Sequence, residues 1–238
     1  MKAMIFAAGM GTRLKPFTDK HPKALAVVNN KTLLQRNIEY LQQFGIYNVI
    51  INVHHFSNQI INALEENKGW GSDVLISNET DEVLETGGGL KKAAWYFKNE
   101  NDFVVMNADV LTDMHLNEMI HQHQQKKCLA TLAVSDRISS RSFLFNANNE
   151  LCGWQNAQTN EQKIVRASET FIPKAFSGIH VINTSIFSLI QQERKFSMVD
   201  IYLSLASKYN IVSFNHSGSK FIDVGKPENI IKAESLFI

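Results

Sequence analysis

The sequence predicts an α/β protein in which helices cover both faces of a mostly parallel sheet, a three-layer αβα sandwich. Short apolar runs alternate with segments of helical periodicity through the first half of the chain. Residues 49–51 are all β-branched and apolar, which is typical of a strand buried on both faces. The chain has 238 residues, 44% of them hydrophobic, which is enough for one sizeable core.

Strands and helices of the first half can be assigned in order along the chain. Strands are expected at residues 2–7, 47–53, 73–77 and 103–107. Helices are expected at residues 32–44, from residue 57 onward and at 87–97. The first of these helices stops at Gly45, a common C-terminal signal. Strands that alternate with helices in this way imply parallel βαβ units.

The second half is richer in strands joined by polar loops. Strands are expected at residues 129–134, 143–145, 151–154 and 176–182, and helices at 185–192, 198–207 and 227–237. The polar, glycine-free segment 155–170 is expected to be a mobile loop. Because no repeat or flexible linker separates the halves, both are expected to contribute to one sheet in a single domain, residues 1–238.

The composition excludes several classes of partner. Twenty-four Lys and Arg residues are balanced by 23 Asp and Glu residues, so no overall charge favours nucleic acid or an anionic membrane. The first residues begin like a signal peptide, but their apolar run is far shorter than the roughly 18 residues that span a bilayer. Cys128 and Cys152 lack metal-ligand spacing and are expected to be buried free thiols. These features predict a cytoplasmic protein.

The loop after the first strand is the strongest functional signal. Residues 5–25 read IFAAGMGTRLKPFTDKHPKAL, with two glycines after an apolar run and basic residues including Arg13 and Lys23. Glycines let backbone N–H groups approach a phosphate, and ligands of doubly wound sheets bind at the carboxyl ends of the strands. The loop lacks the Gly-Lys-Ser/Thr of a P-loop, and Leu14 stands where a dinucleotide fingerprint needs its third glycine. Taken alone, it equally fits an ordinary strand-to-helix turn with solvated lysines.

The longer stretch AAGMGTRLKPFT followed by HPKAL resembles the signature of sugar-1-phosphate nucleotidyltransferases, G-x-G-T-R-L-x-P-L-T…P-K-P-L. The resemblance extends to ETGGG at 85–89, NAD at 107–109 and FIDVGKPE at 221–228, so it covers nearly the whole chain. It implies the Rossmann-like, mostly parallel mixed sheet of nucleotide-diphospho-sugar transferases. It also implies that residues 1–110 form the nucleotide-binding half and residues 111–238 the sugar-phosphate-binding half.

The sequence departs from the family pattern in four places. PKAL replaces PKPL, which removes a proline at position 24 but keeps Lys23, and Asn107-Ala108-Asp109 lacks the usual glycine before the aspartate. The Glu-Lys-Pro and Asn-x-Gly sugar motifs of many relatives are absent, and Glu169-Thr170 and Phe176-Ser177-Gly178 occur instead. The identity of the sugar is therefore left open.

The resemblance assigns roles to individual residues. Arg13 is expected to bind the leaving β,γ-phosphates, and Lys23 the α-phosphate and the incoming sugar phosphate. Asp109 and Asp223 are expected to hold Mg²⁺, although either aspartate alone equally fits a helix cap or turn. The nucleotide is expected to contact Ala7, Ala8, Gly9, Gly11, Thr12, Glu85, Thr86, Gly87 and Asn107. The sugar phosphate is expected to contact Ser142, Glu169, Ser177 and Gly178. Thr86 equally fits a helix N-cap.

The implied substrates are an NTP and a sugar 1-phosphate, and the protein is expected to be a monomer or small homo-oligomer. The ETGGG, FSGI and DVGKPE forms are most similar to N-acetylmuramate 1-phosphate uridylyltransferases, so UTP is favoured. A GTP-dependent mannose or heptose 1-phosphate guanylyltransferase is the nearest alternative. A phosphocholine-type cytidylyltransferase and a catalytically silent module that binds NDP-sugars also remain open.

Overall fold

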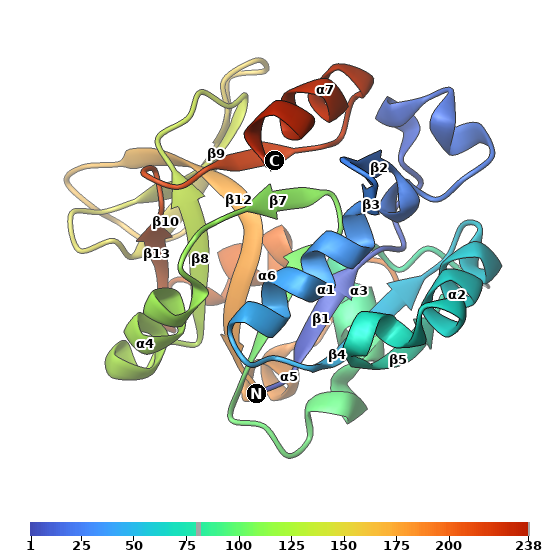
Figure 1. Cartoon of the computed structure of the whole chain (residues 1–238). Coiled ribbons are helices and arrows are strands. Elements are labelled where there is room, and N and C mark those ends of the chain that lie inside the picture. The colour runs from blue at the N-terminus through green and yellow to red at the C-terminus, as the bar shows by residue number, and fades with distance from the viewer. Residues whose placement is uncertain (80–81, 238) are drawn as a thin grey trace.

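The computed structural model describes residues 1–79 and 82–237, and its main element is a ten-stranded mixed sheet (Figure 1). The order along it is β11-β10-β9-β12-β6-β1-β4-β5, and β8 pairs with both β12 and β13. The strands are β1 Ala3–Phe6, β4 Asn48–Val53, β5 Asp73–Asn78, β6 Asp102–Asn107, β8 Ala130–Ser135, β9 Arg141–Phe145, β10 Leu151–Asn156, β11 Glu161–Ile164, β12 Ile172–Asn183 and β13 Ile211–Asn215. The two-stranded sheets are β2 Val27–Val28 with β3 Lys31–Thr32, and β7 Val110–Thr112 with β14 Phe221–Asp223.

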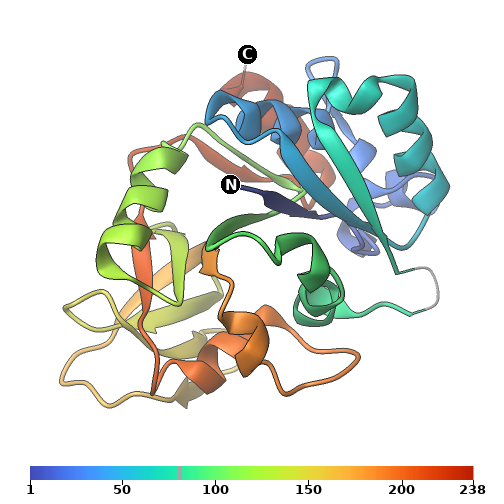
Figure 2. The ribbon, with the colours of Figure 1, turned by 90° about the horizontal axis from the view of Figure 1, so that it is seen from below.

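Helices cover both faces of this sheet, so the predicted αβα fold class is confirmed (Figure 2). The helices are α1 Leu33–Gln43, α2 Ser57–Glu66, α3 Glu85–Lys92, α4 Leu116–Lys126, α5 Ile186–Leu189, α6 Met198–Leu205 and α7 Pro227–Leu236. Short 3-10 turns lie at Thr12–Leu14, Phe17–Asp19, Lys23–Leu25, Lys68–Gly71 and Ala94–Phe97. No described helix is both long enough and apolar enough to cross a membrane.

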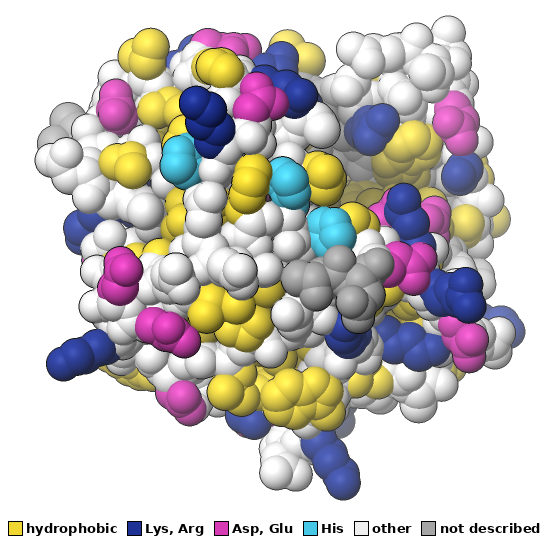
Figure 3. All heavy atoms as spheres, turned by 90° about the vertical axis from the view of Figure 1, so that its right-hand side faces the viewer, with side chains coloured by type: hydrophobic (Ala, Val, Ile, Leu, Met, Phe, Trp, Pro, Cys, Tyr) yellow, Lys and Arg dark blue, Asp and Glu magenta, His cyan; other side chains and the backbone are white. Residues whose placement is uncertain are grey.

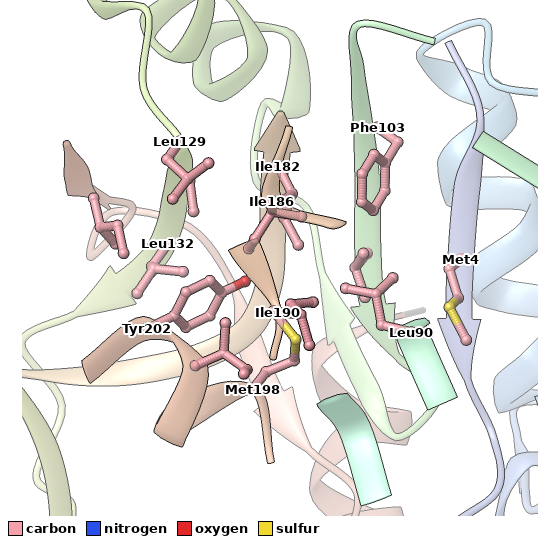
Figure 4. Packing of buried hydrophobic residues seen from close by; sticks show 14 of the residues in the cluster. Met4, Leu90, Phe103, Leu129, Leu132, Ile182, Ile186, Ile190, Met198 and Tyr202 are labelled. Carbon is pink, nitrogen blue, oxygen red and sulfur yellow. The ribbon is translucent and has the colours of Figure 1, made fainter. Parts of the chain in front are cut away.

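The apolar residues of β1 point alternately to two cores, because successive side chains of a strand face opposite sides of the sheet. Met4 belongs to a cluster with residues of α3, α5 and α6, and in Figure 4 it lies near Leu90, with Tyr202 on the other side of the cluster. Ala3 and Ile5 pack on the other face with residues of α1, α2 and α4. A third, smaller cluster comprises Leu14, Ala26, Val28, Leu33, Leu111, Val224 and Ala233. That cluster joins the loop after β1 to β14 and α7.

The parallel strands bring their carboxyl ends to one edge of the sheet. Strand β1 lies between β4 and β6, and it runs parallel to both of them. Strand β12 runs antiparallel to β6, with Ile179 opposite Met106. The chain therefore leaves β1 at Phe6 beside the end of β6 at Asn107, and the functional loops emerge at this edge.

Several expected elements differ in the structure. The segment 155–170 was expected to be a loop, and this is wrong because it contains β11, which pairs antiparallel with β10. All residues of β11 are exposed, so no apolar periodicity marks it. Strands β13 and β14 were not expected. Helix α3 ends at Lys92 and not at residue 97, and α5 is a single turn in place of the helix expected at 185–192. The expectation of buried free thiols at both cysteines is confirmed.

A histidine buried in the larger core makes stability depend on pH. His180 is 2% exposed, its Nδ1 lies 2.6 Å from the hydroxyl oxygen of Tyr202, and burial lowers its pKa from 6.5 to about 3. Between these two pKa values the unfolded chain binds more protons at this residue than the folded chain does. The free energy of unfolding therefore falls as the pH drops below about 6.5. We expect this residue alone to remove about 2 kcal/mol of stability between pH 7 and pH 5.

Urea unfolding at pH 7 and pH 5 measures this effect, with His180→Asn compared with the parent chain. The variant should lose about 2 kcal/mol less stability on acidification than the parent. His121→Asn, at an exposed position of α4, is the matched control and should leave the pH dependence as it is. Equal pH dependence in the parent and His180→Asn would assign the acid loss to other groups.

Candidate active site

The loop after β1 is shaped by one glycine and opened by another. Gly11 has φ +62°, and a Cβ there would lie 2.8 Å from Cγ2 of Thr18. The hydroxyl of Thr18 donates to the carbonyl of Gly11 at 2.9 Å, which closes the bend just before the turn that begins at Thr12. A Cβ at Gly9 would meet no heavy atom within 4 Å, so a ligand can approach the backbone there. The backbone N–H of Ala7 is not free, because it donates to Oδ1 of Asn52 at 2.8 Å.

The two expected catalytic cations occupy different environments. Lys23 is 19% exposed at its side chain, and Nζ donates to Oδ2 of Asp109. Arg13 is 60% exposed at its side chain, with Nη2 3.8 Å from Oδ2 of Asp223. Lys23 thus presents a positioned charge beside the carboxylates, and Arg13 leaves most of its planar donor fork available to a ligand.

Asp109 and Asp223 are brought together by backbone pairing. Asp223 ends β14, where it stands opposite Val110, and the N–H of Val224 donates to the carbonyl of Asp109 at 2.8 Å. Burial raises the pKa of Asp223, the negative charge of Asp109 raises it further, and Lys23 and Arg13 oppose both effects. The two carboxylates therefore repel each other, and only part of this repulsion is relieved by the neighbouring cations.

This pair of carboxylates fits a hard divalent cation. Oδ1 of Asp223 is buried and has no hydrogen-bond partner among the described residues. In residues 1–79 and 82–237, no three His, Cys, Asp or Glu side chains cluster as metal ligands, so a cation here would have two protein carboxylates. Mg²⁺ suits such a site, because it usually keeps several waters and binds substrate phosphates alongside one or two carboxylates.

A cavity of about 330 Å³ lies beside the loop, between β1 and the start of α3. It is lined by Phe6, Ala8, Gly9, Asn52, Glu79, Val83, Glu85, Thr86 and Ser197. Four of these residues were expected to contact the nucleotide: Ala8, Gly9, Glu85 and Thr86. Figure 3 shows the side of the molecule that bears α2 and β5, where a hollow has hydrophobic side chains on its floor and charged ones around its rim.

Five residues that line this cavity were not predicted, and two of them, Asn52 and Glu79, form a buried polar pair. Glu79 is 1% exposed, its Oε1 accepts from Nδ2 of Asn52 at 2.8 Å, and burial raises its pKa against the effect of that bond. Since Asn52 also accepts from Ala7, the Glu79–Asn52 pair fixes the start of the loop. The available signal was a polar residue, Asn52, inside an otherwise apolar buried strand.

The glycines of α3 have a packing role. The N–H groups of Gly87 and Gly88 both donate to the carbonyl of Phe196, at 2.9 and 3.2 Å. A Cβ at Gly87 would lie 2.4 Å from Cδ2 of Phe196, and one at Gly88 would lie 2.1 Å from the carbonyl oxygen of Arg194. These two N–H groups are therefore not available to a nucleotide. The glycines allow α3 to pack closely against the segment that contains Phe196.

Thr86 and Glu85 line the cavity as expected and also have partners within the protein. Thr86 is not the N-cap of α3, because the helix begins at Glu85 and the cap position is Leu84. The Thr86 hydroxyl accepts from the backbone N–H of Met198 at 2.9 Å, which ties α3 to α6. Glu85 has φ +58° and pairs with exposed Lys195 at 3.7 Å.

The expected sugar-side residues fall into two groups. Gly178 lies close to the end of β6, because a Cβ there would be only 2.6 Å from Nδ2 of Asn107. Ser177 is 1% exposed, and its hydroxyl bonds to Arg137 at 2.9 Å and to His216 at 2.7 Å. The expectation that the Ser177 side chain touches the sugar is therefore wrong, since both the burial and the bonds of its hydroxyl prevent contact.

Ser142 and Glu169 lie on other segments of the second half. Ser142 is buried in β9 opposite Gln155 of β10. Glu169 is exposed in the segment ahead of β12, which begins at Ile172, whereas Gly178 lies well inside that strand. The structure does not bring Glu169 together with the other expected site residues.

Comparison with known proteins assigns the family. A family model described as nucleotidyl transferase matches residues 2–237. The chain is 26% identical over 240 residues to a mannose-1-phosphate guanyltransferase of Yarrowia lipolytica, covering 100% of this chain and 64% of the relative. It is 26% identical over 243 residues to the mannose-1-phosphate guanylyltransferase catalytic subunit beta of Xenopus tropicalis, covering 100% and 65%. The chain thus spans just under two thirds of the length of these curated relatives.

A solved structure supports the fold. HddC from Yersinia pseudotuberculosis, complexed with GMP-PN, superposes with a TM-score of 0.81 at 23% identity and covers 100% of this chain and 99% of that one. The family match extends over almost the entire chain, from the loop after β1 to α7, and so includes all four charged residues of the candidate site. The chain belongs to the nucleotidyl transferase family.

Proposed function

We propose that this protein transfers a nucleoside monophosphate from an NTP to a sugar 1-phosphate. A phosphate oxygen of the sugar 1-phosphate forms a bond to the α-phosphorus of the NTP, and the bond from that phosphorus to the bridging oxygen of pyrophosphate breaks. The observation that carries the proposal is the meeting of Lys23, Arg13, Asp109 and Asp223 at the carboxyl ends of the sheet strands.

The charged side chains would position and neutralise two anionic reactants. Lys23 is held beside Asp109 and would bind oxygens of the α-phosphate, where charge shifts as the new bond forms. Arg13 would bind the leaving phosphates through its exposed fork. The sugar phosphate is already ionised near neutral pH, so the reaction needs no general base from the protein.

Asp109 and Asp223 would hold Mg²⁺, and the unpartnered Oδ1 of Asp223 fits this role. When bound, the cation would supply neutralising charge to the phosphate oxygens. The two buried free cysteines support a reducing compartment, and we place the reaction in the cytoplasm.

GTP and mannose 1-phosphate are the proposed substrates. This choice is supported by the names of the Yarrowia and Xenopus relatives, which are mannose-1-phosphate guanyl- or guanylyltransferases. Within the ETGGG segment that favoured UTP, the backbone N–H groups of Gly87 and Gly88 donate to Phe196 and are not available to a base. UTP with N-acetylmuramate 1-phosphate remains the second candidate, on the ETGGG, FSGI and DVGKPE forms.

Pyrophosphate release tests the proposal. Each NTP is paired with phosphocholine and with each of a panel of sugar 1-phosphates, at millimolar Mg²⁺. We expect GTP with mannose 1-phosphate to exceed UTP with N-acetylmuramate 1-phosphate by at least about tenfold in kcat/KM, or about 1.4 kcal/mol. The reverse order would restore the uridylyltransferase assignment, and release from CTP with phosphocholine would indicate a cytidylyltransferase. NDP-sugar binding without release from any pair would identify a silent binding module.

A further inference from the structure

Strand β12 contains an irregularity where it passes the candidate site. It pairs with β8 at Phe176 opposite Val134, and the pairing resumes only at His180 opposite Leu132. Three residues of β12 therefore lie across from one residue of β8, so the ladder is interrupted between these pairs. Within the interruption Gly178 has φ +72° and lies against Asn107. Ile179 still pairs with Met106 of β6, but on the β8 side something other than the sheet ladder must hold this bulge, defined here as residues 177–179.

Arg137, two residues beyond the end of β8, bonds to the residues that lead into the bulge and to its first residue, Ser177. Its Nη1 lies 2.9 Å from Oγ of Ser177 and 3.2 Å from the carbonyl oxygen of Ala175, and its Nη2 donates to the carbonyl of Phe176. Nη1 also lies 2.7 Å from Oγ of Ser135, the last residue of β8. The guanidinium thus holds three consecutive residues that lead into the bulge. Because most of its donors already have acceptors in the protein, Arg137 is suited to positioning and not to capturing a free anion.

The same guanidinium also reaches the strand that carries Asp223. Its central carbon lies 4.4 Å from the centre of the Phe221 ring, a cation–π distance. Phe221 precedes Asp223 by two residues in β14, so both side chains are on the same face of that strand. Arg137 therefore joins the bulge of β12 to the strand of one proposed metal ligand.

His216 supports Ser177 from the opposite side. It is 5% exposed, and Nε2 lies 2.7 Å from Oγ of Ser177. Burial, aided by the charge of Arg137, lowers the pKa of His216 to about 4, so the ring is neutral near pH 7. The Ser177 hydroxyl is consequently held between a permanent cation and a neutral ring, both supplied by other segments of the chain.

We propose that Arg137 is a positioning residue for the sugar 1-phosphate. By holding residues 175–177 it fixes Gly178 against Asn107, two residues before Asp109, and so sets the wall of the site on the sugar side. The inference rests on the proposed function. The hydrogen bonds of Arg137 go to residues 135 and 175–177 and not to the described residues that line the cavity beside α3, so nucleotide binding in that cavity should depend on Arg137 much less than sugar phosphate binding does.

Steady-state kinetics of Arg137→Lys and Arg137→Gln test the proposal. Lysine keeps the charge but lacks the planar fork, so both variants should behave alike. We expect the KM for the sugar 1-phosphate to rise at least about tenfold, while the KM for the NTP stays within about twofold. Arg166→Lys is the matched control, because Arg166 likewise donates to main-chain carbonyls, those of Ala206 and Tyr209, away from the site. The urea midpoint of Arg166→Lys should fall about as much as that of Arg137→Lys. Both KM values of Arg166→Lys should stay unchanged.

Amide hydrogen exchange across residues 177–180 supplies a second readout that needs no turnover. Exchange there should be faster in Arg137→Lys than in the parent chain, and unchanged in Arg166→Lys. Unchanged exchange in Arg137→Lys would show that Arg137 does not hold the bulge and would overturn the proposal. Lower stability with an unchanged KM for the sugar 1-phosphate would make Arg137 merely structural and would also overturn the proposal. If the parent chain turned over no substrate pair, the proposed function would fail. The exchange data would still show whether Arg137 holds the bulge.

Discussion

Replacing Asp109 or Asp223 with asparagine is expected to lower kcat by at least about a hundredfold. Each substitution removes a negative charge from the pair of carboxylates proposed to hold Mg²⁺, and a metal clamp of this kind is worth several kcal/mol. The effect should appear in pyrophosphate release measured across a range of Mg²⁺ concentrations. The concentration needed for half-maximal activity should rise as well.

Stability separates this result from simple misfolding. The pKa of Asp223 is raised by burial and by Asp109, so the charged form is strained in the folded protein. Asp223→Asn relieves that strain, and the free energy of unfolding is expected not to fall. Asp73→Asn, at the exposed start of β5, is the matched control and should retain normal activity. Near-normal turnover with unchanged Mg²⁺ dependence in either site variant would show that the residue is not a ligand.

Lys23→Ala is expected to lower kcat/KM by about 3 kcal/mol, a typical loss for a preorganised charge in a partly closed site. Lys23 is mostly buried at the side chain and is oriented by Asp109, so its ammonium group needs little rearrangement to meet a phosphate. Steady-state kinetics with the best substrate pair of the panel measures the loss. Lys20→Ala, an exposed lysine of the same loop, should have little effect.

Unaltered kinetics in Lys23→Ala would mean that Lys23 only balances the carboxylates. A melting temperature measured on the same variant distinguishes the cases, because removal of the cation leaves Asp109 and Asp223 facing each other. A drop in stability with normal kinetics would assign Lys23 a structural role. Loss of activity with little change in stability would support the catalytic one.

The central strands could be predicted because burial on both faces leaves a clear sequence pattern. Strand β4 shows this in its β-branched residues, whereas β11 is exposed along its length and carries no such pattern. Strand β14 has only three residues and exists through pairing with β7, a partner from the middle of the chain. Pairings of this kind depend on the assembled fold, and local propensity does not record them.

The candidate site shows the same division. The motifs identified Lys23, Asp109 and Asp223, which the structure brings into one place. Arg137 and His216 could not be identified, because their importance comes from contacts with Ser177 across the fold. The signal that was misread was Ser177 itself, a polar side chain whose partners lie inside the protein.

The small third core has a consequence for the making of the protein. Leu14 in the loop after β1 packs in the same cluster as Val224 and Ala233, and β14 delivers Asp223 from that same late segment. A nascent chain on the ribosome would therefore contain the loop after β1 long before it contained the carboxylates of both Asp109 and Asp223. Until residues 221–237 emerge and dock, such an intermediate lacks one of the two proposed metal ligands, so we expect a half-made chain to leave nucleotides uncleaved.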